Sequence, residues 1–285
     1  MKRFSILSLL AAALLVFSAC DKIAEDEYVV FAGVSGTWYD SEATIPALQR
    51  AFVEKYTGVR CVNCPNADVV LHDLSEKYGD QLVVAAVHVP NNFGKPLHGE
   101  QDLRTEKGST WFNTFFSPSQ NLPSALLNRT KVDGNSLDII DPQARFDDKI
   151  DAVLSATPQM GMMLGCTRDG GVYNAEVHIQ FNQTISDALT LTLLVVEDKV
   201  YTTQEGRTAD GIVEFENYEQ NHVLRDVVTD AWGIDAVADG NQGTKRMIVL
   251  PVSLAEGWNA DNCHLIAFVS NKATREIVNT AQCNL

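Results

Sequence analysis

A Cys-x-x-Cys segment formed by Cys61 and Cys64 lies between a strand-like run and a helix-like run. The run before it, residues 51–58 (AFVEKYTG), is apolar and aromatic and ends at a glycine. The run after it, residues 67–80, carries apolar residues at helical spacing. A helix N-terminus stabilises a thiolate, and a second thiol can resolve a mixed disulfide. The segment therefore predicts a strand–turn–helix unit with two chemically active thiols at the turn.

The residues leave three interpretations of this cysteine pair open. The strand–turn–helix context favours a redox-active pair, whereas a permanent disulfide is common in exported proteins. Zinc is disfavoured because no second Cys-x-x-Cys or Cys/His pair completes four ligands, and Pro65 stands where covalent haem attachment needs His. In a redox pair we expect Cys61, beside Arg60 and nearer the helix start, to be the nucleophile. Cys64 would then be the buried resolving thiol.

The N-terminus has the pattern of a targeting segment. A basic start is followed by residues 6–17, an apolar run too short to span a membrane in the mature protein, and small residues directly precede Cys20. The pattern predicts a lipoprotein signal over residues 1–19 and acylation of Cys20. The alternative is an ordinary secretory signal that happens to contain a cysteine. Residues 20–44 then form an acidic tether and lead-in.

Charge narrows the range of partners. The 285-residue chain has a net charge of −15, which becomes −17 when Lys2 and Arg3 are removed with the signal. A strongly acidic chain argues against nucleic acid and anionic membrane surfaces as partners. The mature length is enough for two modest domains, each with its own core.

Periodicity divides the mature chain into residues 45–157 and residues 158–285. In the first part strand-like and helix-like runs alternate, which predicts an α/β domain. In the second part short runs alternate apolar and polar residues between turn-forming clusters, which predicts an antiparallel β-sandwich of the immunoglobulin-like kind. The expected strands are residues 51–58, 81–89, 122–128, 175–181, 189–195, 212–215, 246–254, 264–271 and 275–281. The expected helices are residues 66–78 and one within 138–156 that starts at Asp141-Pro142, and residues 108–116 form either a helix or an aromatic cap over the core.

The first part resembles thioredoxin-like domains. In that fold a cis-proline begins the strand that faces the cysteine pair, and Pro123 occupies a matching place before an apolar run. The ordinary alternative is a trans proline at a strand start. The chain departs from common thioredoxins because Lys55 stands where many of them carry a buried Asp as proton relay. Glu54 is the remaining candidate for that role, although a shift of one residue reverses its side of the strand.

Two motifs resemble the outer-membrane-protein-28-related family of bacterial lipoproteins. Residues 56–65 (YTGVRCVNCP) are similar to its signature, and residues 221–225 (NHVLR) resemble a second segment of the family. The resemblance implies a lipid-anchored outer-membrane protein, facing the periplasm or the cell surface, with a thioredoxin-like N-terminal domain. It implies little about function. Exchange by the cysteine pair would make exported proteins the partners, and we expect no metal, nucleic acid or small-molecule cofactor.

The remaining cysteines suggest a second pairing. If residues 264–271 and 275–281 form a hairpin that turns near Ala273, Cys263 lies opposite Cys283 and a cross-strand disulfide becomes possible. A slip of one residue would break this pairing. Cys166 would then stay free. The histidines at positions 72, 88 and 222 are expected to have structural or surface roles.

Two hypotheses about function remain. In the first, Cys61, Cys64 and Pro123 serve thiol–disulfide exchange on exported proteins, which would make the chain a thiol–disulfide oxidoreductase. In the second, the chain is a surface adhesin or assembly component in which the cysteine pair is a structural disulfide. Fold alone does not decide between them.

Overall fold

A computed structural model describes residues 35–130, 146–237 and 240–285, all within the unit Gly33–Leu285. The predicted lipoprotein signal over residues 1–19, Cys20 and most of the tether over residues 20–44 lie outside the described residues. So does the predicted helix start at Asp141-Pro142.

Strands and helices alternate through the first part of the chain. The main elements are β2 (Ala51–Thr57), α1 (Cys64–Tyr78), β3 (Leu82–His88), α2 (Glu106–Phe115), β4 (Ser124–Leu127) and α3 (Phe146–Ser155), with short 3-10 turns at Gly79–Gln81 and Asn92–Gly94. β2 pairs in parallel with β3 and antiparallel with β4. These three strands are buried along nearly their whole length, because α1 and α3 pack on one face and α2 packs on the other. Apolar runs without alternation are what such doubly covered strands require.

Local sequence explains where the first two helices begin. Pro65 stands at the start of α1, where its fixed φ suits the first turn and its missing N–H is not needed. α1 ends before Gly79, whose φ of 52° lies in the region that glycine adopts most easily. α2 is capped by Thr105, whose hydroxyl accepts a hydrogen bond from Gly108 N at 3.0 Å. The cap fixes where α2 begins over the sheet.

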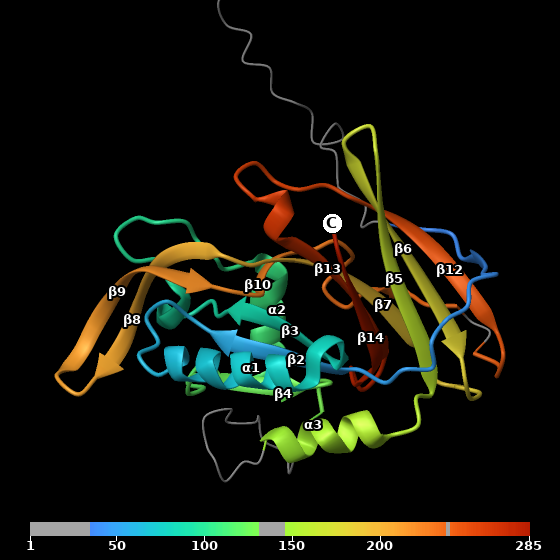
Figure 1. Cartoon of the computed structure of the whole chain (residues 1–285), viewed down its shortest axis with the longest axis horizontal. Coiled ribbons are helices and arrows are strands. Elements are labelled where there is room, and N and C mark those ends of the chain that lie inside the picture. Colours follow the sequence, from blue (N-terminus) through green and yellow to red (C-terminus); the bar gives the residue numbers. More distant parts are fainter. Residues whose placement is uncertain (1–34, 131–145, 238–239) are drawn as a thin grey trace, which may run out of the picture. The chain divides into compact units, whose positions relative to one another are not determined.

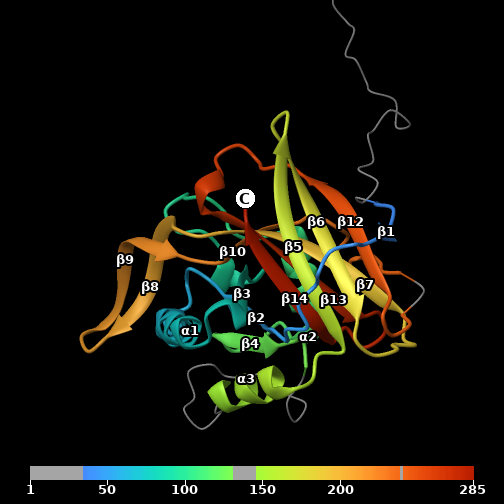
Figure 2. The ribbon, with the colours of Figure 1, turned by 45° about the vertical axis from the view of Figure 1, so that its right-hand side comes forward.

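The second part of the chain is almost entirely β-structure (Figures 1 and 2). Its strands are β5 (Met160–Asp169), β6 (Val172–Phe181), β7 (Leu189–Glu197), β8 (Val200–Thr208), β9 (Gly211–Gln220), β10 (Val223–Val227), β11 (Ile234–Asp235), β12 (Lys245–Val252), β13 (Cys263–Asn271) and β14 (Ile277–Asn284). A four-stranded sheet with the order β1-β12-β6-β5, where β1 is Tyr39–Asp40, packs against β7, β13 and β14. The space between them is filled by inward-facing apolar side chains such as Val177, Leu193 and Leu265.

Both parts of the chain contribute to a single eight-stranded sheet. Its order is β14-β13-β7-β10-β3-β2-β4, and β11 pairs with β7. β10 makes the junction: it pairs with β7 on one side and, at Val223 opposite Ala86, with β3 on the other. The carbonyl of His222 accepts a 2.7 Å hydrogen bond from Ala86 N. The 221–225 motif therefore lies where the two parts of the chain join in one sheet. The predicted domain boundary between residues 157 and 158 stays a prediction.

The predicted strands and helices that lie in the described residues are confirmed, but five strands were not predicted. β1, β5, β8, β10 and β11 are absent from the expectation, and each has a local reason. β5 is rich in Gly and Met, β8 is mostly polar, β10 is only five residues long, and β1 and β11 have two residues each. Low β-propensity or short length hides such strands.

The predicted disulfide between Cys263 and Cys283 is wrong. β13 and β14 form the expected antiparallel hairpin, but Cys283 lies opposite Leu265, and Cys263 pairs with Glu197 of β7. Both thiols are free, as is Cys166.

Two local features displace the register of this hairpin. Asn271 N donates to Glu276 O at 2.9 Å, so the turn is one residue longer than a turn centred on Ala273. A β-bulge between Val269 and Ser270 shifts the pairing by a further residue. Bulges of this kind cannot be read from an alternating pattern, although they move every pair beyond them.

Candidate functional site

The Cys61–Cys64 disulfide lies where β2 leads into α1. Its Cα atoms are 5.4 Å apart, and Cys64 is the first residue of the helix. Cys64 N donates to Cys61 O at 3.1 Å, which closes the turn that carries the pair. The sequence thus places two linked sulfur atoms at a helix N-terminus, where the helix dipole stabilises a thiolate formed on reduction.

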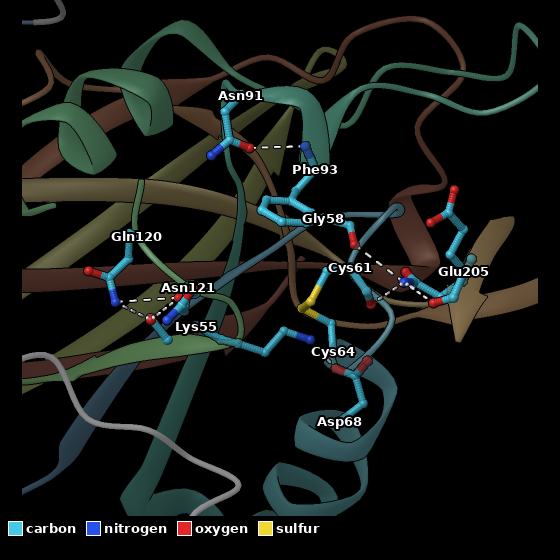
Figure 3. Close-up of a disulfide and its surroundings, with 12 residues drawn as sticks. Lys55, Gly58, Cys61, Cys64, Asp68, Asn91, Phe93, Gln120, Asn121 and Glu205 are labelled. Atoms are coloured by element: carbon cyan, nitrogen blue, oxygen red, sulfur yellow. Dashed lines mark hydrogen bonds and ion pairs between the residues drawn. A yellow bond between two sulfur atoms is a disulfide. The ribbon is translucent and has the colours of Figure 1, made fainter. Parts of the chain in front are cut away.

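A hairpin from the second part of the chain covers this disulfide. Cys61 is 2% exposed and Cys64 is 0% exposed. Gln204 of β8 donates its side-chain amide to Cys61 O at 3.2 Å and to Gly58 O at 3.3 Å (Figure 3). The next residue, Glu205, donates its backbone N–H to Val59 O at 2.8 Å. The β8–β9 hairpin therefore limits access to Cys61, and no sequence pattern signalled this contact.

The charge of Arg60 is directed away from the disulfide. Its guanidinium donates to Lys95 O at 2.9 Å and to Pro96 O at 3.0 Å, and it lies 3.8 Å from a Glu205 carboxylate oxygen. These contacts hold the loop after β3 against the cysteine turn. In the disulfide form, Arg60 therefore holds the neighbouring loop in place and is not directed at the sulfur of Cys61.

An ion pair between Lys55 and Asp68 lies beside Cys64. Lys55 is buried, and its ammonium contacts Asp68, which is on α1 one turn after Cys64 (Figure 3). The second carboxylate oxygen of Asp68 accepts a 3.0 Å hydrogen bond from the hydroxyl of Tyr218 on β9. Burial, together with the charge of Asp68, raises the pKa of Tyr218 well above its usual value. Asp68 thus links the cysteine helix to the covering hairpin.

Glu54 does not reach this neighbourhood, so its candidacy as proton relay is wrong. Its side chain points to the other face of β2 from Lys55, as strand alternation requires. The guanidinium of Arg129 donates three hydrogen bonds of 2.6 to 3.0 Å to the carboxylate of Glu54, and both side chains are buried. The guanidinium also lies over the rings of Trp111 and Phe268, at 4.5 and 4.7 Å from their centroids. Glu54 is thereby committed to an interior ion pair.

The loop before β4 runs beside the disulfide. The peptide bond between Leu122 and Pro123 is cis, and Leu122 packs in the apolar cluster that holds both cysteines. Gln120 and Asn121 are drawn near the pair in Figure 3, and Ser124 fixes the loop by donating to Asn121 O at 2.7 Å. Cys61, Cys64 and the segment that contains Pro123 are thus close together in space.

The histidines at positions 72, 88, 222 and 264 have different surroundings. His72 is exposed and lies 3.5 Å from Glu76. His222 and His264 both contact Asp198, at 3.3 and 2.8 Å, beside a cavity of about 400 Å³. His88 is buried, and neither of its ring nitrogens has a hydrogen-bond partner among the described residues. Burial lowers its pKa to about 3, so its imidazole is neutral.

The described residues contain neither a metal-binding cluster nor a membrane-spanning helix. Across residues 35–130, 146–237 and 240–285, His, Cys, Asp and Glu do not gather in a group of three or more that could hold a metal ion. Within the same ranges, every helix is too short or too polar to cross a membrane.

Comparison with known proteins identifies a family and a shared fold. The chain aligns with HBP35 of Porphyromonas gingivalis at a TM-score of 0.63 and 17% identity, over 85% of this chain and 77% of that one. A protein from Agrobacterium tumefaciens aligns at a TM-score of 0.50 and 17% identity, over 83% and 95% of the two chains. No curated protein matches. The family described as outer membrane protein Omp28 matches residues 115–285, more than half of the chain. The chain therefore belongs to the Omp28 family and is a protein of the outer membrane.

Proposed function

We propose that this outer-membrane protein, anchored by a lipid on Cys20, carries out thiol–disulfide exchange on exported proteins through Cys61 and Cys64. In this proposal the elements from β2 to α3 form a thioredoxin-like unit, and the four-stranded sheet with β7, β13 and β14 forms an immunoglobulin-like sandwich that docks partners. The observation that carries the proposal is the site itself. The disulfide lies at the first residue of α1, the buried Lys55 lies beside Cys64, and the loop that contains Pro123 runs next to the pair.

The exchange proceeds in two steps. A thiolate of the partner attacks the sulfur of Cys61, the Cys61–Cys64 bond breaks, and Cys64 leaves as a thiolate beside the ammonium of Lys55. A second thiolate of the partner then attacks the partner sulfur of the mixed disulfide and releases Cys61. The partner is oxidised by two electrons to a disulfide, and its two protons end on Cys61 and Cys64. A positive charge next to Cys64 favours its departure.

Attack on Cys61 requires movement of the β8–β9 hairpin. In the structure the Gln204 amide ties the hairpin to the carbonyl of Cys61, and only 2% of Cys61 is exposed. The outer strand β9 carries the exposed apolar side chains of Ile212 and Phe215, which a partner can contact. A partner that displaces the hairpin would gain both a docking surface and access to the sulfur.

The same burial favours a second candidate function. In a surface adhesin or assembly component, the disulfide would fasten the start of α1 permanently, and the hairpin would keep thiols away. The covered sulfur atoms and the hydrogen bonds from Gln204 and Glu205 to the cysteine turn suit that role. Binding would then use the loops of the sandwich.

The reduction potential of the pair separates the two functions. We expect equilibration of the full chain with defined thiol–disulfide buffers to give a potential above about −300 mV, in the range of exchange proteins. A variant with Cys61→Ser and Cys64→Ser should show no transition, which assigns the signal to this pair. A value well below −300 mV would instead identify a permanent staple.

A further inference from the structure

Cys166 and Cys283 lie on the two sheet edges that meet at one corner of the sandwich. Cys166 is on β5, the last strand of the four-stranded sheet, and Cys283 is on β14, the last strand of the eight-stranded sheet. Both side chains are half-buried and pack against the same apolar cluster between the sheets. The two thiols therefore point into one shared space from facing elements.

Two polar contacts align these edges. Asn279 of β14 donates its side-chain amide to Met160 O of β5 at 2.7 Å. Arg50 lies 3.4 Å from both Met162 O of β5 and Thr280 O of β14, and so bridges them. Beyond these contacts the strands continue side by side in the same direction (Figures 1 and 2).

The positions of the two cysteines follow from this alignment. Cys166 comes four residues after Met162, and Cys283 comes three residues after Thr280. Counted from the contact between Asn279 and Met160, the advances are six and four residues. Because strands rise about 3.3 Å per residue, both thiols lie within one or two residues of the same level of the corner. Each cysteine faces the cluster, so the two side chains enter the gap between the sheets from its two sides.

The electrostatic surroundings of the thiols agree with this geometry. Burial and the charge of Cys166 raise the pKa of Cys283 to about 12, so the two sulfur atoms lie within electrostatic reach of each other. Cys263, by contrast, responds to burial, Glu197, Arg225 and Asp198. Of the three free thiols in residues 35–130, 146–237 and 240–285, Cys166 and Cys283 are the neighbouring pair.

We propose that Cys166 and Cys283 form a disulfide in the exported protein and tie β5 to the C-terminal strand. Proteins beyond the inner membrane meet oxidising conditions, in which such bonds persist. A disulfide-type oxidant such as glutathione disulfide balances the reaction. One cysteine thiolate attacks it and releases one glutathione, and the second cysteine attacks the mixed disulfide and releases the other. Two electrons and two protons pass from the cysteines to the two glutathiones.

Non-reducing peptide mapping of the full chain tests this pair. The protein is incubated with glutathione disulfide at mildly alkaline pH, where thiolates are more abundant, then denatured, alkylated and digested without reductant. We expect a peptide pair that links Cys166 to Cys283, and an alkylated Cys263. Alkylation of both Cys166 and Cys283 after oxidation would overturn the proposal, as would a link from either of them to Cys263.

Two variants supply the controls. Cys263→Ser should leave the linked peptide unchanged, whereas Cys166→Ser should abolish it. A long closed loop stabilises a fold, so the oxidised wild type should melt about 5–10 °C above Cys166→Ser. Equal melting temperatures, with the linked peptide absent from the wild type, would show that the sheets meet without a covalent tie. The result for Cys61 and Cys64 does not enter this comparison, so the proposal stands or fails independently of exchange.

Discussion

Replacement of Glu54 by Gln is expected to lower the free energy of unfolding by about 3–5 kcal/mol. The reason is the buried ion pair with Arg129, whose side chains are 0% and 1% exposed. Without the carboxylate, the guanidinium stays buried with only the aromatic faces of its neighbours to offset its charge. Breaking one side of such a pair leaves an uncompensated interior charge, and this accounts for most of the loss. Urea unfolding at neutral pH measures the change.

Two further variants make this prediction specific. Asp40→Asn removes an ion pair with Arg246 in which the Asp40 side chain is 81% exposed, and its effect should not exceed about 1 kcal/mol. Glu54→Gln combined with Arg129→Met removes both interior charges and should recover part of the loss. A loss below about 1 kcal/mol for Glu54→Gln would show that the interior pair contributes no more than a surface pair.

Acidification from pH 6.5 to pH 4.5 is expected to cost about 2 kcal/mol of stability through His88 alone. Burial, together with the charges of Lys55 and Arg225 and against the opposing charge of Asp102, lowers the pKa of His88 to about 3. The unfolded chain therefore takes up a proton near pH 6.5 that the folded protein does not accept until about pH 3. The contribution of neutral His88 to stability is fully present above about pH 6.5, the pKa in the unfolded chain. It is lost as the pH falls toward about 3, the pKa in the folded protein.

Comparison with His88→Leu isolates this contribution. The wild type should lose about 2 kcal/mol more than His88→Leu between the two pH values, measured by urea unfolding at each. His72→Leu removes an exposed histidine and should keep the pH dependence of the wild type. Equal losses in the wild type and His88→Leu would mean that His88 is protonated in the folded protein at pH 4.5.

The sequence predicts the elements around the cysteine pair well because their signals are local. Apolar runs define β2 and β3, helical spacing and Pro65 define α1, and alternation places Lys55 and Glu54 on opposite faces. These signals extend over a few residues and depend on burial and backbone geometry alone. They locate the disulfide and one of its charged neighbours.

The rest of the site depends on contacts between distant segments. Gln204 reaches the carbonyl of Cys61 across 143 positions of sequence, and Tyr218 reaches Asp68 across 150. Nothing local to β8 or β9 indicates that this hairpin folds over the cysteine turn. The same limit explains the failed pairing of Cys263 with Cys283, because one longer turn and one bulge together moved the register by two residues.

The 221–225 motif can be recognised in the sequence, but its structural role becomes clear only from its contacts in the fold. His222 adopts a φ of 57°, and its N–H donates to Asp198 at 2.7 Å while its carbonyl accepts from Ala86. Arg225 lies 3.2 Å from Glu197 and stacks over Trp258. These contacts hold β10 between β7 and β3. The motif thus serves the junction of the sheet, which no single segment could predict.

Mixed-disulfide trapping in the native host tests the central proposal most directly. In Cys64→Ala the thiolate of Cys61 is free to attack a partner disulfide, which is the reverse of the exchange proposed above. Because Cys64 is absent and cannot resolve the mixed disulfide, the partner stays covalently attached to Cys61 and appears on non-reducing gels. We expect discrete adducts that disappear with reductant and with a second change, Cys61→Ala. Adding Gln204→Ala should increase their yield, because it frees the hairpin from the cysteine turn. The absence of adducts in both backgrounds, with the wild-type pair fully oxidised, would contradict exchange and establish the disulfide as a structural staple.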